Sequence, residues 1–565
     1  MVPQENSPAE APAPVVAEKA PPAPQGPQSI TISLGQISTE LGVPRNRLEQ
    51  QAAILARFLD TRRLPQGFCT NDDNESTEKL CSVVEMVENN RTASVARREG
   101  GRRVPIRPHH FRQQQSLGYG RLMKSIHREP VQRVMVWAPR MLAITSCPRN
   151  LSAVALRKLE SALPSPAVRN MMEKLYEHAV ACLRPQDEGY EITHLRQGLL
   201  RYQWGQKDKA RQSLERAAIA EDSVDRPRVL YWAGRLQNTS ANRNRYWDQL
   251  INESPLSFHA LEVWRARNQD PLQIFESRPP LTLTRHVDNE DVDNAMRWLE
   301  TLYVLGKTES AQKLARWLNT HFKEEIPPST ALYVSALKSS RGTPLNTITF
   351  LTRQVNENPA MLNQQTLRLL FPRPFFDVFD RNSPDTDTSL VLGVARQESG
   401  FNPRARSPMN AQGLLQLLPS TARIMSGKRR NNLYDSETNA RLGIKFLSQL
   451  IEKFGSVELA LAGYNAGPGR IDEWTARFPT KDATLFMDLI PFKETRHYVA
   501  NIVRNNYWYD RLYSSENAAS RSLASTSLSK SHKLQRSNVV ARLVKAHISA
   551  RTASTAVIDE SEEDL

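Results

Sequence analysis

The chain has 565 residues, of which 39% are hydrophobic and 24% charged, and its formal net charge is +15 at pH 7. A single hydrophobic core rarely serves more than about 250 residues, so several domains are expected. The positive charge favours an anionic partner, and the lack of an apolar run of about 18 residues excludes a membrane-spanning helix.

The cysteines and short motifs narrow the possible classes further. The four cysteines are Cys69, Cys81, Cys147 and Cys182. In an oxidising compartment they would form two disulfides, by sequence proximity Cys69–Cys81 and Cys147–Cys182; four unpaired thiols are the equally open alternative. No Cys-x-x-Cys occurs, so neither redox catalysis nor zinc is expected. No RNA-binding signature is present either, which argues against nucleic acid.

The first 150 residues divide into a tail and a mixed region. Residues 1–28 are rich in Pro and Ala, show no secretory signal, and are expected to be a disordered spacer. Residues 29–150 are predicted to be mainly helical, with one helix-like pattern from Ile30 to about Arg63. A basic run near residues 89–115 would either grip an anionic polymer or form a solvated loop, and the loop is favoured.

From residue 151 the apolar pattern is helical almost throughout, and helices recur in pairs. Turn residues stand near positions 205, 238, 306 and 342, each between two apolar helical segments. This approximates a period of about 34 residues with one double gap, which is typical of a two-helix solenoid. We therefore predict a helical-hairpin superhelix over residues 151–372. Its tryptophans are expected to pack between helices rather than to bind sugar: Trp204, Trp232, Trp247, Trp264, Trp298 and Trp317.

Candidate chemistry is concentrated between residues 390 and 509. An apolar helix over 390–395, with Thr388 or Ser389 as its expected N-cap, leads into Glu398 and ends at Gly400. Partial burial favours the protonated form of a carboxyl, as a general acid requires. A glutamate at a helix end is by itself usually a surface residue, so this pattern needs support from elsewhere in the chain.

That support comes from four blocks in fixed order. They are RQESGFNP at 396–403, GLLQLLPSTA at 413–422, AGYNAGPGR at 462–470 and IPFKETRHYV at 490–499. Over roughly 140 residues they resemble the soluble lytic transglycosylase family, whose motifs are Glu-Ser at a helix end, Gly-Leu-Met-Gln, Ala-Tyr-Asn-Ala-Gly-Pro-Gly and Pro-(Phe/Tyr)-x-Glu-Thr-Arg-x-Tyr-Val. The resemblance implies a mostly α fold, in which the superhelix precedes a lysozyme-like catalytic domain over residues 373–513.

The resemblance also assigns roles to individual residues, without cofactor or metal. Glu398 matches the catalytic glutamate. Gln416 matches a glutamine that lines the cleft beside the acid. Ser407 matches a serine that contacts the bound sugar. Tyr464 matches a tyrosine whose hydroxyl lies near the catalytic glutamate, and Asn465 matches the neighbour of that tyrosine. Glu494 and Tyr498 match two residues that close the far side of the groove.

Three positions depart from the family pattern, and none removes a chemical group. Leu415 replaces Met with little change of volume. Asn410 replaces a Gly, and Asn tolerates a left-handed backbone better than most residues. Gly463 replaces Ala and slightly weakens its helix.

The implied reaction uses one carboxylate instead of the usual two. Glu398 would protonate the leaving oxygen of a β-1,4 bond in peptidoglycan and then accept the proton of the C6 hydroxyl, which closes a 1,6-anhydro ring. Asp435, Glu437, Glu452 and Glu473 lie in the same domain but outside the matching blocks. A lysozyme-like hydrolase and a non-catalytic wall-binding scaffold remain the alternatives.

The resemblance further implies a monomer that acts on peptidoglycan strands in the periplasm. The missing signal is then attributed to a mature chain or a misassigned start, and residues 1–28 to a spacer. Residues 514–565, rich in Ser and Ala and ending in acidic residues, are expected to be a disordered tail apart from a short helix over 539–548.

Overall fold

The computed structural model describes residues 32–88, 126–142 and 151–518, except at 62, 65–67, 70–76, 127–128, 188, 221–222, 323–324 and 342–343. In these ranges the regular elements are helices, and extended pairing is limited to isolated bridges between residues 406 and 417. The predicted mostly α class is confirmed. The basic run at 89–115, the tail at 1–28, and residues 519–565 with the predicted short helix lie outside the described residues.

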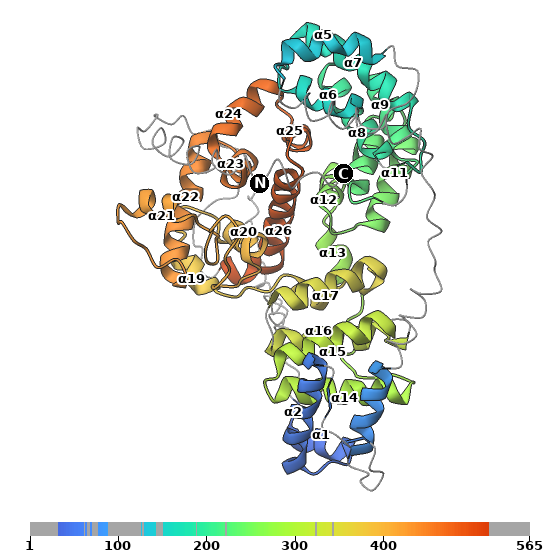
Figure 1. The fold of residues 1–565 in the computed structure, drawn as a ribbon, viewed down its shortest axis with the longest axis vertical. Helices are drawn as coiled ribbons and strands as arrows, with labels where there is room; N and C mark the ends of the chain where they lie inside the picture. The colour runs from blue at the N-terminus through green and yellow to red at the C-terminus, as the bar shows by residue number, and fades with distance from the viewer. Residues whose placement is uncertain are drawn as a thin grey trace, which may run out of the picture.

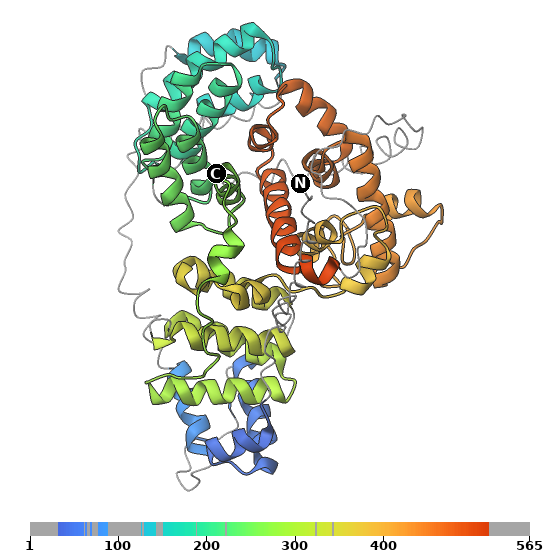
Figure 2. The ribbon, with the colours of Figure 1, turned by 180° about the vertical axis from the view of Figure 1, so that it is seen from behind.

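Helices α5 to α18 form the superhelix, which curves around the C-terminal helices (Figures 1 and 2). The elements are α5 (Val131–Leu142), α6 (Leu151–Glu160), α7 (Pro166–Ala181), α8 (Tyr190–Gln203), α9 (Lys207–Ala217), α10 (Arg226–Arg235), α11 (Ser240–Glu253), α12 (Phe258–Ala266), α13 (Pro271–Glu276), α14 (Glu290–Val304), α15 (Thr308–His321), α16 (Pro328–Arg341), α17 (Pro344–Glu357), the short η2 (Pro359–Met361) and α18 (Gln364–Leu370).

The four predicted hairpins are confirmed as the pairs α8–α9, α10–α11, α14–α15 and α16–α17. The long interval between the turns near residues 238 and 306 does not contain a further complete hairpin. Instead it contains the short helices α12 and α13, followed by a stretch without regular structure over 279–287. Pro279 and Pro280 begin this stretch, and proline removes the N–H that a continuing helix needs.

The tryptophans of the superhelix pack between helices, as predicted. Trp232 and Trp298 are fully buried, and Trp247 and Trp264 are 7% exposed. The partly buried Trp204 and Trp317 pack against the edges of the hydrophobic cores. These rings therefore hold helices together and present little surface to a sugar.

The N-terminal helices pack at one end of the superhelix (Figure 1). The single pattern predicted from Ile30 to Arg63 is two helices, α1 (Leu34–Leu41) and α2 (Arg45–Thr61), because Gly42 takes a left-handed conformation and Pro44 follows it. With the helix at 77–88 they share a core with α14 to α16, whereas α5 packs on α6 and α7. Residues 29–150 are thus divided between two parts of the molecule.

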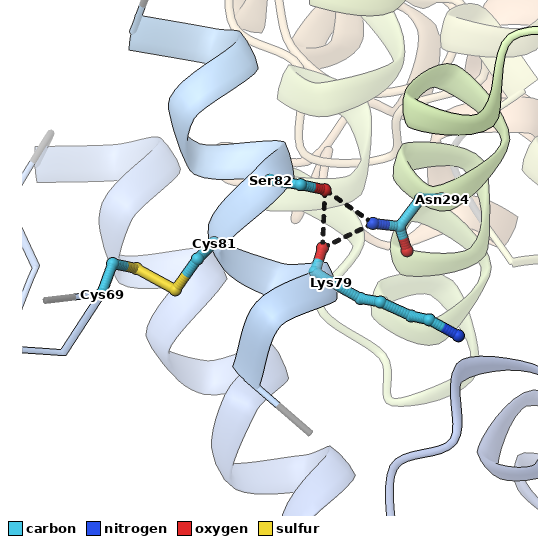
Figure 3. Close-up of a disulfide and its surroundings, with 5 residues drawn as sticks. All are labelled: Cys69, Lys79, Cys81, Ser82 and Asn294. Carbon is cyan, nitrogen blue, oxygen red and sulfur yellow. Dashed lines mark hydrogen bonds between the residues drawn. A yellow bond between two sulfur atoms is a disulfide. The ribbon is translucent and has the colours of Figure 1, made fainter. Parts of the chain in front are cut away.

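A disulfide secures this N-terminal group (Figure 3). Cys69 and Cys81 are bonded with their Cα atoms 5.7 Å apart, as proximity predicted. The residue that follows Cys81 in the same helix is Ser82, whose Oγ accepts from Asn294 Nδ2 at 2.8 Å and so connects the helix to α14. Cys182 is also disulfide-bonded, and Cys147, its predicted partner, lies outside the described residues.

The C-terminal domain surrounds one central helix, α20, which packs along the long helix α26. Within the described ranges no helix is both long enough and apolar enough to cross a bilayer. Helix α26 continues beyond the predicted domain end at residue 513. The helices of this domain are α19 (Phe376–Arg381), α20 (Thr388–Ser399), α21 (Pro419–Ser426), α22 (Ser436–Phe454), α23 (Val457–Ala466), α24 (Pro468–Arg477), α25 (Ala483–Leu489) and α26 (Lys493–Ala518).

Candidate active site

Helix α20 carries Glu398 in its last turn. Its residues 388–395 are all buried, while Glu398 itself is half-buried. The helix ends at Gly400 as predicted, and Gly400 takes a left-handed conformation with φ of 57°. The N-cap prediction is wrong by one residue, because Asp387 accepts from Ser389 N at 3.0 Å and thereby supplies both a cap and a negative charge at the helix N-terminus. A buried helix thus presents one carboxylate at its end.

Tyr498 makes the direct contact with this carboxylate. Its hydroxyl donates to Glu398 Oε1 at 2.7 Å, and its side chain is 5% exposed. The family resemblance placed Tyr498 on the far side of the groove and implied no contact with the acid. The structure brings it to Glu398 because α26 packs along α20.

We expect Tyr498→Phe to lower turnover about 10- to 100-fold while the fold is retained. A hydrogen bond to a charged group contributes about 1.5–3 kcal/mol, and about 1.4 kcal/mol of barrier corresponds to a tenfold change in rate. Phenylalanine keeps the ring and removes the donor alone. The measurement is the initial rate on purified peptidoglycan, the substrate that the family resemblance implies. The control is Tyr434→Phe, which changes an exposed tyrosine of the same domain and should keep its rate. Equal rates for both variants would contradict the role of Tyr498.

Tyr464 is buried beside Glu398, but its hydroxyl has a structural partner. It donates to the Leu415 carbonyl at 2.7 Å. Burial, followed by the negative charge of Glu398, raises the pKa of Tyr464 well above its usual value. Tyr464 therefore stays neutral and supports the 413–417 segment that flanks the acid.

Gln416 lies in that segment with a positive φ of 45°. Its Nε2 donates to the Gly413 carbonyl at 2.8 Å and to the Ala405 carbonyl at 3.1 Å. Both amide hydrogens are therefore directed at the backbone. The side chain is half-buried and held in place before any substrate arrives.

Asn439, on α22, organises the same segment and was missed by the sequence reasoning. It is fully buried; its Oδ1 accepts from Leu415 N at 2.8 Å, and its Nδ2 donates to the carbonyls of Gln412 and Leu433. A polar residue in the apolar register of a long helix was the signal that could have revealed it, because a buried amide requires partners.

Ser399 was also missed, although it stands beside the acid. Its hydroxyl donates to the Leu414 carbonyl at 2.8 Å. This bond fastens the end of α20 to the segment that carries Gln416. The helix with the acid and the neighbouring loop are thus one unit.

Ser407 and Asn410 form a tight turn next to the segment of Gln416. Ser407 Oγ accepts from Ala411 N at 3.0 Å, and Ser407 N donates to the Ala411 carbonyl at 2.9 Å. Asn410 has a positive φ of 65°, which is the conformation that the replacement of Gly by Asn was predicted to tolerate. The turn survives that departure from the family pattern.

Asn465 connects the end of α23 to the start of α26. Its Oδ1 accepts from Thr495 Oγ1 at 2.6 Å, and its Nδ2 lies 3.4 Å from Glu494 Oε1. Glu494 is exposed. Asn465 therefore acts on the orientation of the helix that carries Tyr498.

The other carboxylates considered from the sequence are mostly engaged in structural contacts. Asp435 caps α22 by accepting from Thr438 N at 2.9 Å, and this hydrogen bonding lowers the pKa of Asp435. Glu437 accepts from Asn382 at 2.7 Å, and Glu473 pairs with Arg477. Glu452 is exposed on α22. Glu398 is the carboxylate of this domain that combines partial burial with a tyrosine donor.

Comparison with known proteins identifies this region. Residues 380–487 match the family model described as the transglycosylase SLT domain. Residues 380–487 are therefore similar to a transglycosylase SLT domain, and this matched region is called the SLT domain below. The match begins at α19 and ends within α25, so it includes Glu398, Gln416 and Tyr464, while Glu494 and Tyr498 follow it directly.

Curated relatives are similar to part of the chain. The chain is 37% identical over 150 residues to the soluble lytic murein transglycosylase of Salmonella typhimurium and 36% identical over 150 residues to that of Escherichia coli. A putative soluble lytic murein transglycosylase of Haemophilus influenzae is 35% identical over 161 residues. The first two alignments cover 25% of this chain and 23% of each relative, so they span about a quarter of the relatives' length.

Two solved structures are similar over more of the chain. The lytic transglycosylase Slt of Pseudomonas aeruginosa has 20% identity and a TM-score of 0.48, and covers 84% of this chain and 80% of its own. The 70 kDa soluble lytic transglycosylase of Escherichia coli has 17% identity and a TM-score of 0.46, and the similarity covers 86% of this chain and 82% of that one.

Proposed function

We propose that this chain is a lytic transglycosylase of peptidoglycan, which cleaves the β-1,4 bond between N-acetylmuramic acid and N-acetylglucosamine and leaves 1,6-anhydro ends. The observation that carries the proposal is the pairing of Glu398 with the Tyr498 hydroxyl at the end of a buried helix, beside the SLT-domain loop of Gln416. The catalytic domain of the proposal extends over residues 373–513, and α26 carries it on to Ala518.

In the proposed reaction Glu398 acts as acid and then as base. It donates its proton to the leaving glycosidic oxygen while the N-acetyl carbonyl of the substrate stabilises the positive charge at C1. The carboxylate then accepts the proton of the C6 hydroxyl, whose oxygen bonds to C1 and closes the ring. Each cycle returns the proton to Glu398, and water is not consumed. Tyr498 holds Oε1 in place through both steps.

The engagement of the other carboxylates supports a one-carboxylate mechanism. Retaining hydrolases hold a second carboxylate about 5–5.5 Å from the acid, and inverting enzymes about 6.5–9.5 Å away. Asp435, Glu437 and Glu473 instead serve as a helix cap, an amide partner and an arginine partner. The substrate's own N-acetyl group then supplies the second function.

The remaining predicted residues are proposed to bind the glycan. Because the Nε2 hydrogens of Gln416 are directed at backbone carbonyls, we expect its Oε1 to accept from a substrate amide. Ser407, in its tight turn, and the exposed Glu494 are proposed to contact sugar hydroxyls. Tyr464 and Asn465 support the cleft from behind through Leu415 and Thr495.

Digestion of purified sacculi followed by mass spectrometry tests the proposal. A lytic transglycosylase releases muropeptides that are lighter by one water than hydrolytic products. Products of the hydrolytic mass would favour the lysozyme-like alternative. Binding of sacculi without any released product would favour a non-catalytic scaffold.

The disulfides support a location outside the cytoplasm. Cys69 and Cys81 are bonded and Cys182 is bonded as well, and such bonds persist in oxidising compartments such as the periplasm. We therefore propose a periplasmic protein that acts as a monomer on peptidoglycan strands, without a cofactor.

The net charge of +15 predicts salt-dependent binding to the wall. Attraction between exposed charges is screened beyond about 8 Å at physiological salt. Retention on sacculi in a sedimentation assay should therefore fall as salt rises, while turnover of short soluble muropeptides should change little. Retention that is indifferent to salt would show that charge does not drive binding.

A further inference from the structure

The turn between α25 and α26 is held by side chains of the superhelix. Asp488, in the last turn of α25, is 4% exposed. Its Oδ2 accepts from Trp232 Nε1 of α10 at 2.6 Å and lies 3.0 Å from His259 Nε2 of α12. Arg228 Nε of α10 lies 4.0 Å from the other oxygen. One buried carboxylate thus joins the C-terminal domain to two superhelix helices.

The backbone of the same turn is held by a third helix. Arg196 of α8 donates to the Leu489 carbonyl at 2.8 Å and to the Asp488 carbonyl at 3.2 Å. Arg196 is itself oriented by Glu160, which accepts from its Nε at 3.1 Å. Side-chain and backbone contacts together determine where α25 ends.

The turn leads directly into the catalytic part of α26. Arg496 donates to the Ile490 carbonyl at 2.8 Å and to the Pro491 carbonyl at 3.2 Å, which locks the turn onto the first turns of α26. His497 Nε2 lies 3.6 Å from Asp225 of the superhelix. The next residue is Tyr498, whose hydroxyl donates to Glu398. A continuous series of contacts therefore runs from the superhelix to the acid.

The chemistry of this junction indicates that its contacts set the relative position of the superhelix and the C-terminal domain, besides holding them together. Burying a carboxylate is costly, and apolar residues of similar volume usually join two surfaces at least as stably. A buried charge with directed donors instead imposes one register on the two surfaces. At this junction the register determines the position of the first turns of α26.

We propose that Asp488 is a positioning residue for catalysis: by fixing the turn between α25 and α26 to the superhelix, it holds the Tyr498 hydroxyl against Glu398. The superhelix is then part of the catalytic machinery as well as a scaffold. This inference rests on the proposed function for its kinetic consequence, whereas its structural consequence can be measured without any activity.

The test compares Asp488→Ala with a matched variant, Glu300→Ala, in the full chain. Glu300 on α14 is also a buried carboxylate, 3% exposed, which accepts from Arg285 at 2.6 Å and from Tyr333 at 2.7 Å. Helix α14 packs with the N-terminal helices in a core separate from that of the active site. For Asp488→Ala we expect kcat to fall about tenfold with KM within about twofold; for Glu300→Ala we expect kcat to stay within about twofold.

Two further measurements separate positioning from a general loss of stability. In a Tyr498→Phe background Asp488→Ala should change kcat less than about twofold, because coupled residues are not additive. Hydrogen exchange of the amides of residues 490–500 should be faster in Asp488→Ala and unchanged in Glu300→Ala.

Asp488→Asn, which keeps an acceptor for Trp232, should recover most of the lost kcat. If Asp488→Ala does not fold, Trp232→Phe removes the indole donor and keeps a smaller aromatic ring at this position, and it should lower kcat about threefold.

The inference is overturned by additive effects in the Tyr498→Phe background, by an equal loss of kcat in Glu300→Ala, or by unchanged exchange at residues 490–500. Wild-type protein that releases no anhydro product would instead overturn the proposed function, and the exchange result would still stand on its own.

Discussion

Glu398→Gln is expected to abolish glycan cleavage while leaving the fold intact. Gln has the shape of Glu but neither donates nor accepts the proton, and loss of a general acid–base group typically costs about 10²–10⁴-fold, more when one group serves both steps. Gln also still accepts from Tyr498, so the end of α20 should keep its geometry. The measurement is muropeptide release from sacculi by mass spectrometry, with circular dichroism to verify folding.

The matched control is Glu452→Gln, which removes the same negative charge from an exposed position on α22. Its activity should stay within about twofold of wild type, because exposed charges contribute little to local structure. Activity of Glu398→Gln within a few-fold of wild type would refute the assignment of Glu398, whatever the control does.

Among glycine-to-alanine substitutions in the SLT domain, Gly413→Ala is expected to lower the free energy of unfolding most. Gly413 has a positive φ of 78°, and an added Cβ would lie closer than 3.0 Å to the Leu433 carbonyl oxygen and to the Asn439 amide. Left-handed strain costs about 1–2 kcal/mol and overpacking about 1–3 kcal/mol, so the sum is roughly 2–5 kcal/mol. Displacing Asn439 would also release Leu415 N and, with it, the segment of Gln416. Activity should therefore fall together with stability.

Gly427→Ala separates the two contributions. Gly427 has a similar φ of 69°, but no atom lies within 4 Å of an added Cβ. This variant should lose only the stability that corresponds to left-handed backbone strain, about 1–2 kcal/mol of the free energy of unfolding, and should keep its activity. Urea unfolding of both variants measures the difference. Equal losses of stability would mean that strain alone, and not the contact with Asn439, makes Gly413 necessary.

Helices and their ends were predictable because their signals are local. The hairpin turns near residues 205, 238, 306 and 342, and the end of α20 at Gly400, were found from apolar periodicity and helix-ending residues. The N-cap was wrong by one residue because Asp, Thr and Ser are all good caps and three of them stand in a row. The single pattern from Ile30 to Arg63 hid a break at Gly42, because its apolar spacing continues across the turn.

The sequence by itself determined the helical class and the position of the catalytic candidate at the end of an apolar helix, since both depend on residues close together in the chain. Proximity also indicated Cys69 and Cys81 as a pair, but the structure decided between a disulfide and free thiols. Only the tertiary structure decided that Tyr498 reaches Glu398, that Asn439 holds the loop of Gln416, and that Asp488 is buried against Trp232 and His259. The physical reason is that these contacts join residues of separate helices, and their geometry depends on how helices pack, which neither periodicity nor capping signals encode.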